Sequence, residues 1–467
     1  MSLRTHKIYQ IAQERFTSWG THGILLILMV AMAWVVVTRP SIHGNDGVQN
    51  YVYLRSLMFD GNLDFSNEYE YFISRQAEWF DHKQIPRDPV TDLPINLYGV
   101  GNSLLWAPWV FLFHGGGWVA NQLGADLTLD GFSTLYARAV GFGSAFYASV
   151  GLLLLFRTLA AMRGTAAAAW AVMLVWLTSP LFFYMYLHPS MSHANSFFLS
   201  ALLLSLYLRW VPGEAEGDTS PDRQSLWKWT AMGAVGGLMV LTRYQDGILL
   251  LGLLVGELWL WSRADGSKLR WIARRAGRYA VWLVAFGLVL TPQLFAWKYL
   301  QGSWFSGPRA YVQQGSFSFL APAYAPQVLF SSKHGLFYWH PSLMMAVAGL
   351  LMAGTYLREK LMALACFAGQ VWVVASWSIW WAGASFGHRM FISTLPFLAI
   401  GALFTVGRND RIGFICKVLM MALIAWNFGC IVQYGLGWIP RQDGVPLSVL
   451  AHNNFVRIPM LLIGRAE

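Results

Sequence analysis

The sequence is poor in charged residues and in cysteine. Charged side chains make up only 12% of its 467 residues, whereas soluble domains carry about 25%. The three cysteines, Cys366, Cys416 and Cys430, lie within apolar stretches and without clustered spacing, which argues against a disulfide framework or a zinc site. No serine-nucleophile elbow, HExxH motif or phosphate-cradling glycine loop occurs. These absences disfavour a soluble domain, a disulfide scaffold and the common hydrolase classes.

Apolar residues, 56% of the chain, come in long blocks that predict a polytopic membrane protein. The first block, Gly23–Val37, follows three basic residues and has no small-residue cleavage site after it, so we interpret it as a span rather than a signal peptide. Because a span needs about 20 mostly apolar residues, we predict an all-α fold of about eleven transmembrane helices. They are expected near 22–39, 133–161, 167–187, 191–211, 227–242, 246–262, 279–299, 341–357, 360–381, 389–406 and 412–434.

The formal net charge of +10 reflects topology rather than nucleic-acid binding, because the basic residues lie in short turns between apolar blocks. With a cytoplasmic N-terminus, the basic cluster Arg263–Arg278 falls inside, as the positive-inside rule requires. The long loops 40–97 and 300–340 and the short tail 435–467 then fall outside. The chain is therefore predicted to be one multi-pass module, residues 1–467, of the cytoplasmic membrane.

Residues 98–118 form an apolar block that we do not count as a crossing. The block contains Gly99, Gly101, Pro108 and three consecutive glycines at 115–117. Counting it as a span would also place the cluster Arg263–Arg278 outside. We predict a membrane-surface or re-entrant segment here.

Asp46 lies where the first span meets the first outer loop. A carboxylate at this depth, beside Asn45 and Gly47, is partly desolvated and can act as a general base toward an acceptor hydroxyl. Asp46 can equally cap the helix that follows it, and the spacing does not decide between the two roles. Apolar residues between Val48 and Met58 predict that this helix is amphipathic and interfacial, ending at Asp60-Gly61-Asn62.

Cationic side chains from distant parts of the chain converge on the predicted outer side. Arg138, Arg243, Lys333 and Arg389 occupy outer turns or span ends, where Arg can bind phosphate in a bidentate fork. Each of them alone can instead snorkel to lipid headgroups. Nearby aromatic residues can stack on a sugar or belong to the interfacial aromatic belt: Trp304, Phe305, Trp339, Trp377, Trp380 and Trp381.

His188 and His193 bracket a polar outer turn. Their spacing is not that of two ligands on one helix face, and Pro189 interrupts them, so a metal pair is disfavoured. We expect His193 to hydrogen-bond to a sugar or a phosphate. The sequence singles out no metal ligand, so a divalent metal has only weak support and a metal requirement stays open.

Several short stretches resemble the GT-C superfamily of polytopic glycosyltransferases, in particular bacterial members akin to aminoarabinose transferase and protein O-mannosyltransferases. The strongest is Asp46 after the first span, followed by a first loop containing Asp46-Gly47, Leu54-Arg55-Ser56-Leu57 and Asp60-Gly61-Asn62-Leu63-Asp64-Phe65. The others are Leu97-Tyr98-Gly99-Val100-Gly101, Ser192-His193, Leu241-Thr242-Arg243 and Ser385-Phe386-Gly387-His388-Arg389.

The resemblance implies a helical membrane enzyme that takes sugar from a polyprenyl-phosphate donor and transfers it to a glycan, lipid or protein hydroxyl on the outer face. Asp46 would then be the base. The donor would be bound by Arg55, Arg138, His193, Arg243, Lys333, His334, His388 and Arg389. Unlike several relatives, the chain has no acid adjacent to Asp46, so a second acid would have to be Glu68, Asp88 or Asp92.

Two other functions fit the same pattern. A transporter would bind its solute near the bilayer midplane, but few acids lie within the predicted spans. A ligase that handles a lipid-linked oligosaccharide would use the same outer cationic ring as a glycosyltransferase.

Overall fold

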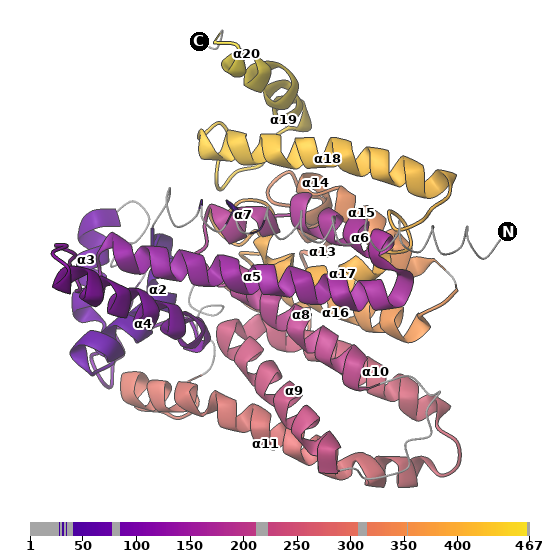
Figure 1. Ribbon diagram of the computed structural model, residues 1–467, viewed down its shortest axis with the longest axis horizontal. Coiled ribbons are helices and arrows are strands. Elements are labelled where there is room, and N and C mark those ends of the chain that lie inside the picture. The colour runs from indigo at the N-terminus through magenta and orange to yellow at the C-terminus, as the bar shows by residue number, and fades with distance from the viewer. Residues whose placement is uncertain are drawn as a thin grey trace.

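A computed structural model of the chain describes residues 41–76, 85–211, 223–306, 315–352 and 354–464, together with Leu28, Val30, Ala31 and Trp34. Within these residues the fold is helical, and the pairings Arg87–Pro94 and Phe317–Trp377 are isolated bridges (Figure 1). The predicted all-α class is confirmed. The long helices are α4 (Gly101–Gln122), α5 (Thr134–Arg163), α8 (His193–Trp210), α9 (Arg223–Thr242), α10 (Leu250–Arg263), α11 (Lys268–Gln301), α16 (Leu357–Ala375) and α18 (Arg411–Gly435).

Most predicted spans correspond to helices, although several are divided. The span near 167–187 forms α6 (Thr165–Leu177) and α7 (Leu181–Tyr186), because Pro180 cannot continue the first helix. The span near 389–406 begins with the 3₁₀ turn Arg389–Thr394 before α17 (Leu395–Ala402), and the span near 341–357 is the shorter α15 (Ser342–Leu351). The span near 22–39 lies almost wholly outside the described residues.

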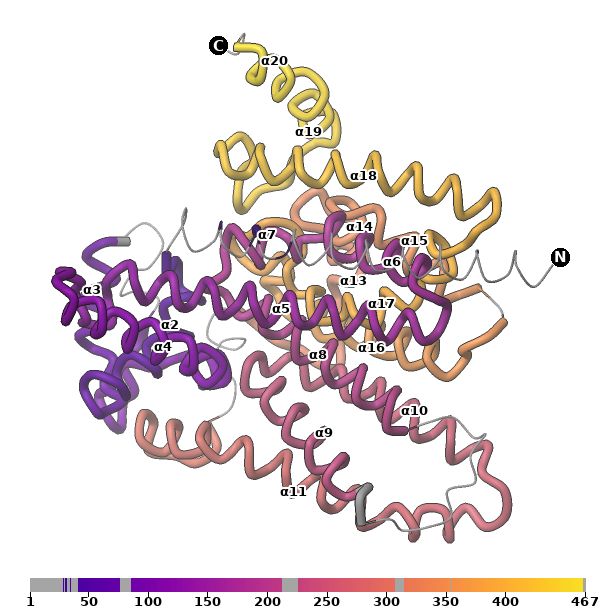
Figure 2. Tube along the Cα trace, in the orientation of Figure 1, coloured from indigo at the N-terminus to yellow at the C-terminus, as the bar shows by residue number. Residues whose placement is uncertain are grey.

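Three described helices are long and apolar enough to cross a membrane by themselves: α5, α11 and α18. Their lengths of 30, 34 and 25 residues exceed the roughly 20 that a bilayer requires. Helices α9 and α11 pack side by side beneath the rest of the molecule in the orientation of Figure 2. The number of crossings, predicted as about eleven, stays a prediction.

Residues 98–118 form most of a single helix, α4, which continues through Pro108 and packs against α2, α5 and α9. The depth of α4 in a membrane stays a prediction.

The first outer loop forms α2 (Gly44–Arg55), a π-helical turn over Ser56–Asp60, and α3 (Ser66–Gln76). The predicted stop is confirmed, since Gly61 adopts a left-handed φ of 67° directly after the turn. Helix α2 occupies the position of the predicted amphipathic helix, and every residue from Gly47 to Arg55 is buried within the protein. Its location at the membrane interface stays a prediction. Polar side chains of α2 bond to neighbouring segments, as the Asn50 side-chain oxygen does by accepting from Asn102 Nδ2 at 2.9 Å.

The second outer loop contains α13 (Ala325–Phe330) and α14 (Leu336–Trp339), and the C-terminal tail contains α19 (Leu447–His452), a π-helical turn (Asn453–Arg457) and α20 (Ile458–Leu462). Two large cores hold the described residues together. One is built mainly from α5 to α8 and α15 to α17, and the other joins α2 and α3 to the first turns of α4 and α5. Figure 1 shows α2, α3 and α4 gathered at one end of α5.

Candidate functional site

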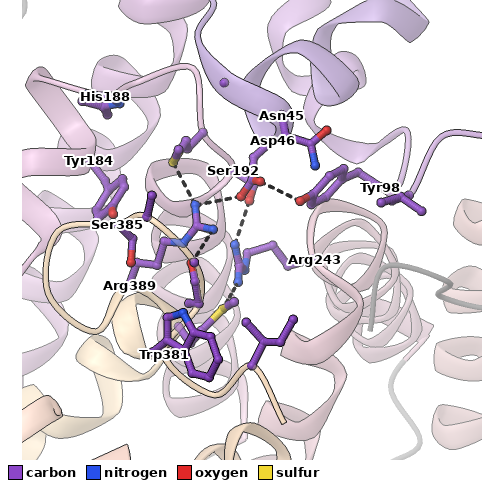
Figure 3. Close-up of a pocket in the computed structure, with 18 of the residues that line it drawn as sticks. Asn45, Asp46, Tyr98, Tyr184, His188, Ser192, Arg243, Trp381, Ser385 and Arg389 are labelled. Atoms are coloured by element: carbon purple, nitrogen blue, oxygen red, sulfur yellow. Dashed lines mark hydrogen bonds and ion pairs between the residues drawn. The ribbon is translucent and has the colours of Figure 1, made fainter. Parts of the chain in front are cut away.

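A cavity of about 830 Å³ lies where several turns meet, and each of these turns was predicted to be outside. Its lining comes from the start of α2, the segment before α4, the turn between α7 and α8, the turn after α9, the segment 377–390 and the residues that follow α18. Figure 3 shows Asp46, Tyr98, Ser192, Arg243 and Arg389, from different segments of this lining, pointing toward one another.

The first turn of α2 brings Asp46 to this cavity. The backbone N–H of His43 donates to Ser190 Oγ at 3.3 Å, which ties the start of α2 to the turn between α7 and α8. Gly47 permits this close approach, since a Cβ at that position would lie 2.9 Å from Ser190 Oγ. The position of Asp46 in the first turn of α2 also stabilises its negative charge, because the N-terminal end of the helix dipole is positive.

Asp46 is paired through both of its carboxylate oxygens. Oδ2 lies 2.7 Å from Arg389 Nη1, and Oδ1 accepts a hydrogen bond of 2.6 Å from Tyr98 Oη (Figure 3). The residue in the N-cap position of α2 is His43, not Asp46. The Asp46 carboxylate is therefore aimed into the cavity at a guanidinium and a phenol.

Arg389 links Asp46 to the other side of the site. Its Nη2 donates to the Ala382 carbonyl at 2.9 Å, and its Nη1 also contacts Met191 Sδ at 3.1 Å. Ala382 adopts a positive φ of 62°, which is uncommon for a residue with a Cβ and aims its carbonyl at the guanidinium. The Arg389 side chain is only 10% exposed, so the charge of its guanidinium acts in an environment of low polarity.

Arg243 enters the cavity from the end of α9. Its Nη1 donates to Ser192 Oγ at 2.9 Å and lies 3.4 Å from His193 Nε2, while Nη2 contacts Met390 Sδ at 2.9 Å. Its Nε lies 4.0 Å from an Asp246 oxygen, which fixes the stem of the side chain.

Two glycines before and within α4 set the distance between Tyr98 and Arg243. A Cβ at Gly99 would collide with the Leu241 carbonyl oxygen, and a Cβ at Gly101 would collide with the backbone of Thr242. Only glycine lets these two backbones touch. Because of this close approach, Tyr98, which precedes Gly99, and Arg243, which follows Thr242, both line the cavity.

The three predicted second acids lie elsewhere. Glu68 is fully buried against Arg55 Nη1 at 3.0 Å, and burial raises the pKa of Glu68 to about 7. Asp88 is buried and accepts from the Val90 N–H within a turn, and Asp92 points to solvent with its side chain 89% exposed. Among the described residues that line the cavity, Asp46 is the only carboxylate.

Two predicted donor-binding arginines do not line the cavity. Arg55 binds Asp60 and Glu68 and stacks on Phe132, with Cζ 4.0 Å from the ring centroid, so it holds the first loop together. Arg138 lies half-buried near the start of α5. Both stay predictions as donor-binding residues, without support from this geometry.

The remaining predicted residues lie behind the cavity wall. Lys333 Nζ stands 3.6 Å from the ring centroid of Trp381, a lining residue, and His193 supports Arg243. His334 Nε2 lies 3.0 Å from the Arg441 carbonyl oxygen, and His388 packs edge-on against Phe391. These residues surround Arg243 and Arg389 without lining the space itself.

The six predicted aromatic residues also divide into those that line the cavity and those that do not. Trp377 and Trp381 line the cavity, Trp339 and Trp380 are buried, and Trp304 and Phe305 are exposed. Only the first two are placed to contact a sugar.

Several lining residues were not predicted from the sequence, above all Tyr98 and Arg441. Tyr98 stands next to Gly99 in a stretch that carried the family resemblance, and Arg441 belongs to the predicted outer tail. His43 and His188 also line the cavity with ring centroids 5.7 Å apart. Burial and the charge of Arg441 lower the pKa of His43, so this imidazole is neutral near pH 7.

The lining thus combines three guanidinium groups, Arg243, Arg389 and Arg441, with one carboxylate. Such a cavity has an excess of positive charge and suits a ligand with a phosphate or carboxylate group. No group of three or more His, Cys, Asp or Glu side chains in the described ranges is placed to hold a metal ion.

No protein-family model matches the sequence, and no curated protein matches it significantly. The fold is similar to that of ArnT from Cupriavidus metallidurans, whose crystal structure was determined with undecaprenyl phosphate bound. The TM-score is 0.50 and the sequence identity 14%, over 96% of this chain and 76% of the ArnT chain. The two proteins therefore share a fold.

Proposed function

We propose that this protein of GT-C fold transfers a sugar from a polyprenyl-phosphate donor to an acceptor hydroxyl, on the outer face of the cytoplasmic membrane. The observation that carries the proposal is the meeting of one carboxylate, Asp46, with Arg243 and Arg389 in a single cavity. The crystallisation of ArnT with undecaprenyl phosphate supports the same donor class for a related fold.

Asp46 has the position and the partners of a general base. An ionised carboxylate offers about four lone-pair sites, and Arg389 and Tyr98 occupy two of them. The remaining lone pairs face the cavity and can accept the proton of an acceptor hydroxyl. The two partners fix the orientation of the carboxylate before substrate binds, so no reorganisation is needed during the reaction.

Arg243 and Arg389 suit the departing phosphate. Transfer breaks the bond between the anomeric carbon and the phosphate oxygen, and the electron pair stays on the lipid phosphate. Charge therefore develops where guanidinium donors that are already oriented stabilise it most. Ser192 and Ala382 hold the two side chains in place.

The reaction is a direct displacement at the anomeric carbon, in which the bond formed, the bond broken and the proton are all accounted for. The acceptor oxygen forms a bond to the anomeric carbon, its proton passes to Asp46, and polyprenyl phosphate leaves with the negative charge. The lipid tail remains in the bilayer, so an active site on the outer face needs no nucleotide sugar.

The test is the Asp46→Asn variant. The amide keeps the shape and can still contact Tyr98, but it cannot accept a proton, so we expect turnover to fall by at least about 100-fold. Radiolabelled polyprenyl-phosphate sugar and membranes from a strain lacking the protein would provide donor and acceptor. Asp92→Asn, at a highly exposed side chain, is the matched control and should keep full turnover.

Near wild-type transfer by Asp46→Asn would reject the assignment of the base. Mass analysis of the product adds a second criterion, because a single added sugar supports a glycosyltransferase and a transferred chain supports an oligosaccharide ligase. Flux of a labelled solute without any product would favour a transporter.

A further inference from the structure

The segment between α18 and α19, residues 436–446, crosses the second outer loop and reaches the cavity. We call it the C-terminal strap. Two of its side chains, Arg441 and Gln442, line the cavity, although they follow Asp46 by almost the whole length of the chain. Gly437, with a φ of 71°, ends α18 and turns the chain toward the site.

The strap is held by specific contacts to the segment 331–338. His334 Nε2–H donates to the Arg441 carbonyl at 3.0 Å, since a carbonyl can only accept. Tyr338 Oη donates to the Val445 carbonyl at 2.7 Å, and the Val445 N–H donates to the Ser332 carbonyl at 3.4 Å. Burial lowers the pKa of His334 to about 4, so the ring is neutral near pH 7 and its single proton serves this bond.

Further anchors lie on both sides of Arg441. Ile439 and Val445 are buried at 2% exposure each, and the Arg457 guanidinium stacks on Trp438 with Cζ 3.9 Å from the ring centroid. A strap fixed at so many points keeps the backbone of Arg441 in one place. Its side chain is thus presented to the cavity by a rigid support, which is what a binding residue requires.

Arg441 makes a different set of contacts from Arg243 and Arg389. Its Cζ lies 5.4 Å from the Tyr434 ring centroid, and its charge acts on His43. The segments next to it are exposed, including Pro440 and Gln442, whereas Arg389 is buried beside Asp46. Arg441 therefore belongs to the part of the cavity that faces solvent.

We infer that the C-terminal strap forms a second anion subsite, in which Arg441 binds an acidic group, carboxylate or phosphate, of the acceptor. This inference rests on the proposed function. One departing phosphate is matched by two guanidinium groups, Arg243 and Arg389, so the third cation suits a separate anion. An acceptor arriving from the aqueous side meets the exposed strap before it reaches Asp46.

The experiment measures binding without turnover. Full-length protein in nanodiscs is first saturated with undecaprenyl phosphate, so that the donor side of the cavity is filled. Glycerol 3-phosphate, glucuronate and neutral glucose are then titrated separately by calorimetry. The variants are Arg441→Gln, the charge-retaining Arg441→Lys, and Arg270→Gln, which removes the same charge from an exposed site on α11.

We expect at least one acidic probe to bind the wild type and to bind Arg441→Gln about tenfold more weakly. Arg441→Lys should fall between them, and Arg270→Gln should match the wild type. The tighter of the two acidic probes identifies the acceptor group as phosphate or carboxylate, and glucose should show no dependence on residue 441.

Equal affinity in Arg441→Gln, or no binding of either acidic probe to the wild type, would overturn the inference. Binding of the acidic probe to protein free of undecaprenyl phosphate, but not to protein saturated with it, would do so too, because competition between the two assigns Arg441 to the donor. These results leave the Asp46→Asn transfer assay untouched. A wild-type protein without transferase activity, in contrast, would reject the proposed function alone.

Discussion

Arg389 is the residue on which the geometry of the site depends most. It contacts the Asp46 carboxylate, the Ala382 carbonyl and the Met191 sulfur at the same time, which uses the planar fork of a guanidinium. A lysine has the same charge but concentrates it at one point, and it cannot reach all of these partners.

We therefore predict that Arg389→Lys transfers sugar at least about 10-fold more slowly than the wild type, and Arg389→Gln about 100-fold or more. The glutamine variant loses the charge as well as the geometry. The measurement is kcat with saturating donor, and Arg408→Lys is the control, since Arg408 pairs with its near neighbour Asp410 and does not belong to the described cavity lining. Full activity in Arg389→Lys would mean that charge alone suffices.

Glu68 is predicted to make the first outer loop sensitive to pH. Burial raises its pKa from the ordinary 4.5 to about 7, against the opposing effect of the Arg55 hydrogen bond. A carboxyl whose pKa is raised by folding binds its proton more tightly in the folded state. Its contribution to stability is therefore fully present below pH 4.5 and is lost as the pH rises through about 7.

The loss corresponds to a few kcal/mol, since each pKa unit is worth about 1.4 kcal/mol. Hydrogen exchange of the α3 amides should speed up between pH 5 and pH 8, after correction for intrinsic exchange. The Glu68→Gln variant, which does not titrate, should show a flat profile. The same corrected rise in Glu68→Gln would assign the effect to another group.

At the scale of elements, the contact between α4 and the end of α9 determines the spacing of Tyr98 and Arg243. Gly101→Ala should disturb it, because the added Cβ collides with the backbone of Thr242, and backbone atoms cannot move aside as a side chain can. Overpacking of this kind costs about 1–3 kcal/mol. We expect a lower melting temperature and slower transfer in the same variant.

Gly115→Ala is the matched control, because it lies in the same helix and an added Cβ there meets nothing within 4 Å. That substitution should be neutral or stabilising by about 0.5–1 kcal/mol, since alanine is the better helix former. Equal effects of the two substitutions would show that the α4–α9 contact does not control the site.

Elements that depend on local sequence were predictable, and elements that depend on packing were not. The stop at Gly61 was predicted and follows from the backbone chemistry of glycine. The break at Pro180 was not predicted, although it follows from the backbone chemistry of proline, because the apolar block near 167–187 continues through it. The amphipathic pattern of α2 did not reveal that its polar side chains are buried, where the side-chain oxygens of Gln49 and Asn50 accept hydrogen bonds from the Leu97 N–H and from Asn102 Nδ2. Periodicity reports which residues are polar, but not whether another segment of the protein satisfies them.

At the scale of the whole molecule, the topology alone brought Asp46, Arg243 and Arg389 to the same side. Their convergence could be predicted because each stands in a turn that alternation of the spans places outside. Tyr98 and Arg441 could not be predicted, because their roles depend on how α4 approaches α9 and how the C-terminal strap crosses the second loop. Arg55 is the opposite case. Its sequence motif predicted a donor-binding residue, whereas in the structure its guanidinium forms ion pairs with Glu68 and Asp60.

The helices run between two chemically different ends. Helix α8 begins at His193 beside the cavity and ends at Trp210, and α18 begins at Arg411 and ends beside Tyr434, which lines the cavity. The opposite end collects basic turns: Arg358 donates to the Val211 carbonyl at 3.0 Å, and Arg163 lies over the Phe404 ring. At about 1.5 Å per residue, the 30 residues of α5 separate the two ends by about 45 Å, enough to cross a bilayer.

This separation makes the orientation testable with two positions. Single cysteines replace Glu70 in α3, on the predicted outer side, and Arg270 in α11, on the predicted inner side; both residues are exposed. The background carries alanine at Cys366, Cys416 and Cys430. A membrane-impermeant maleimide added to intact cells should label Glu70→Cys and leave Arg270→Cys unlabelled, whereas both should react after permeabilisation. The reverse pattern would place the cavity on the cytoplasmic face, where a nucleotide-activated sugar is accessible, and the argument for a lipid-phosphate donor would lose its topological support.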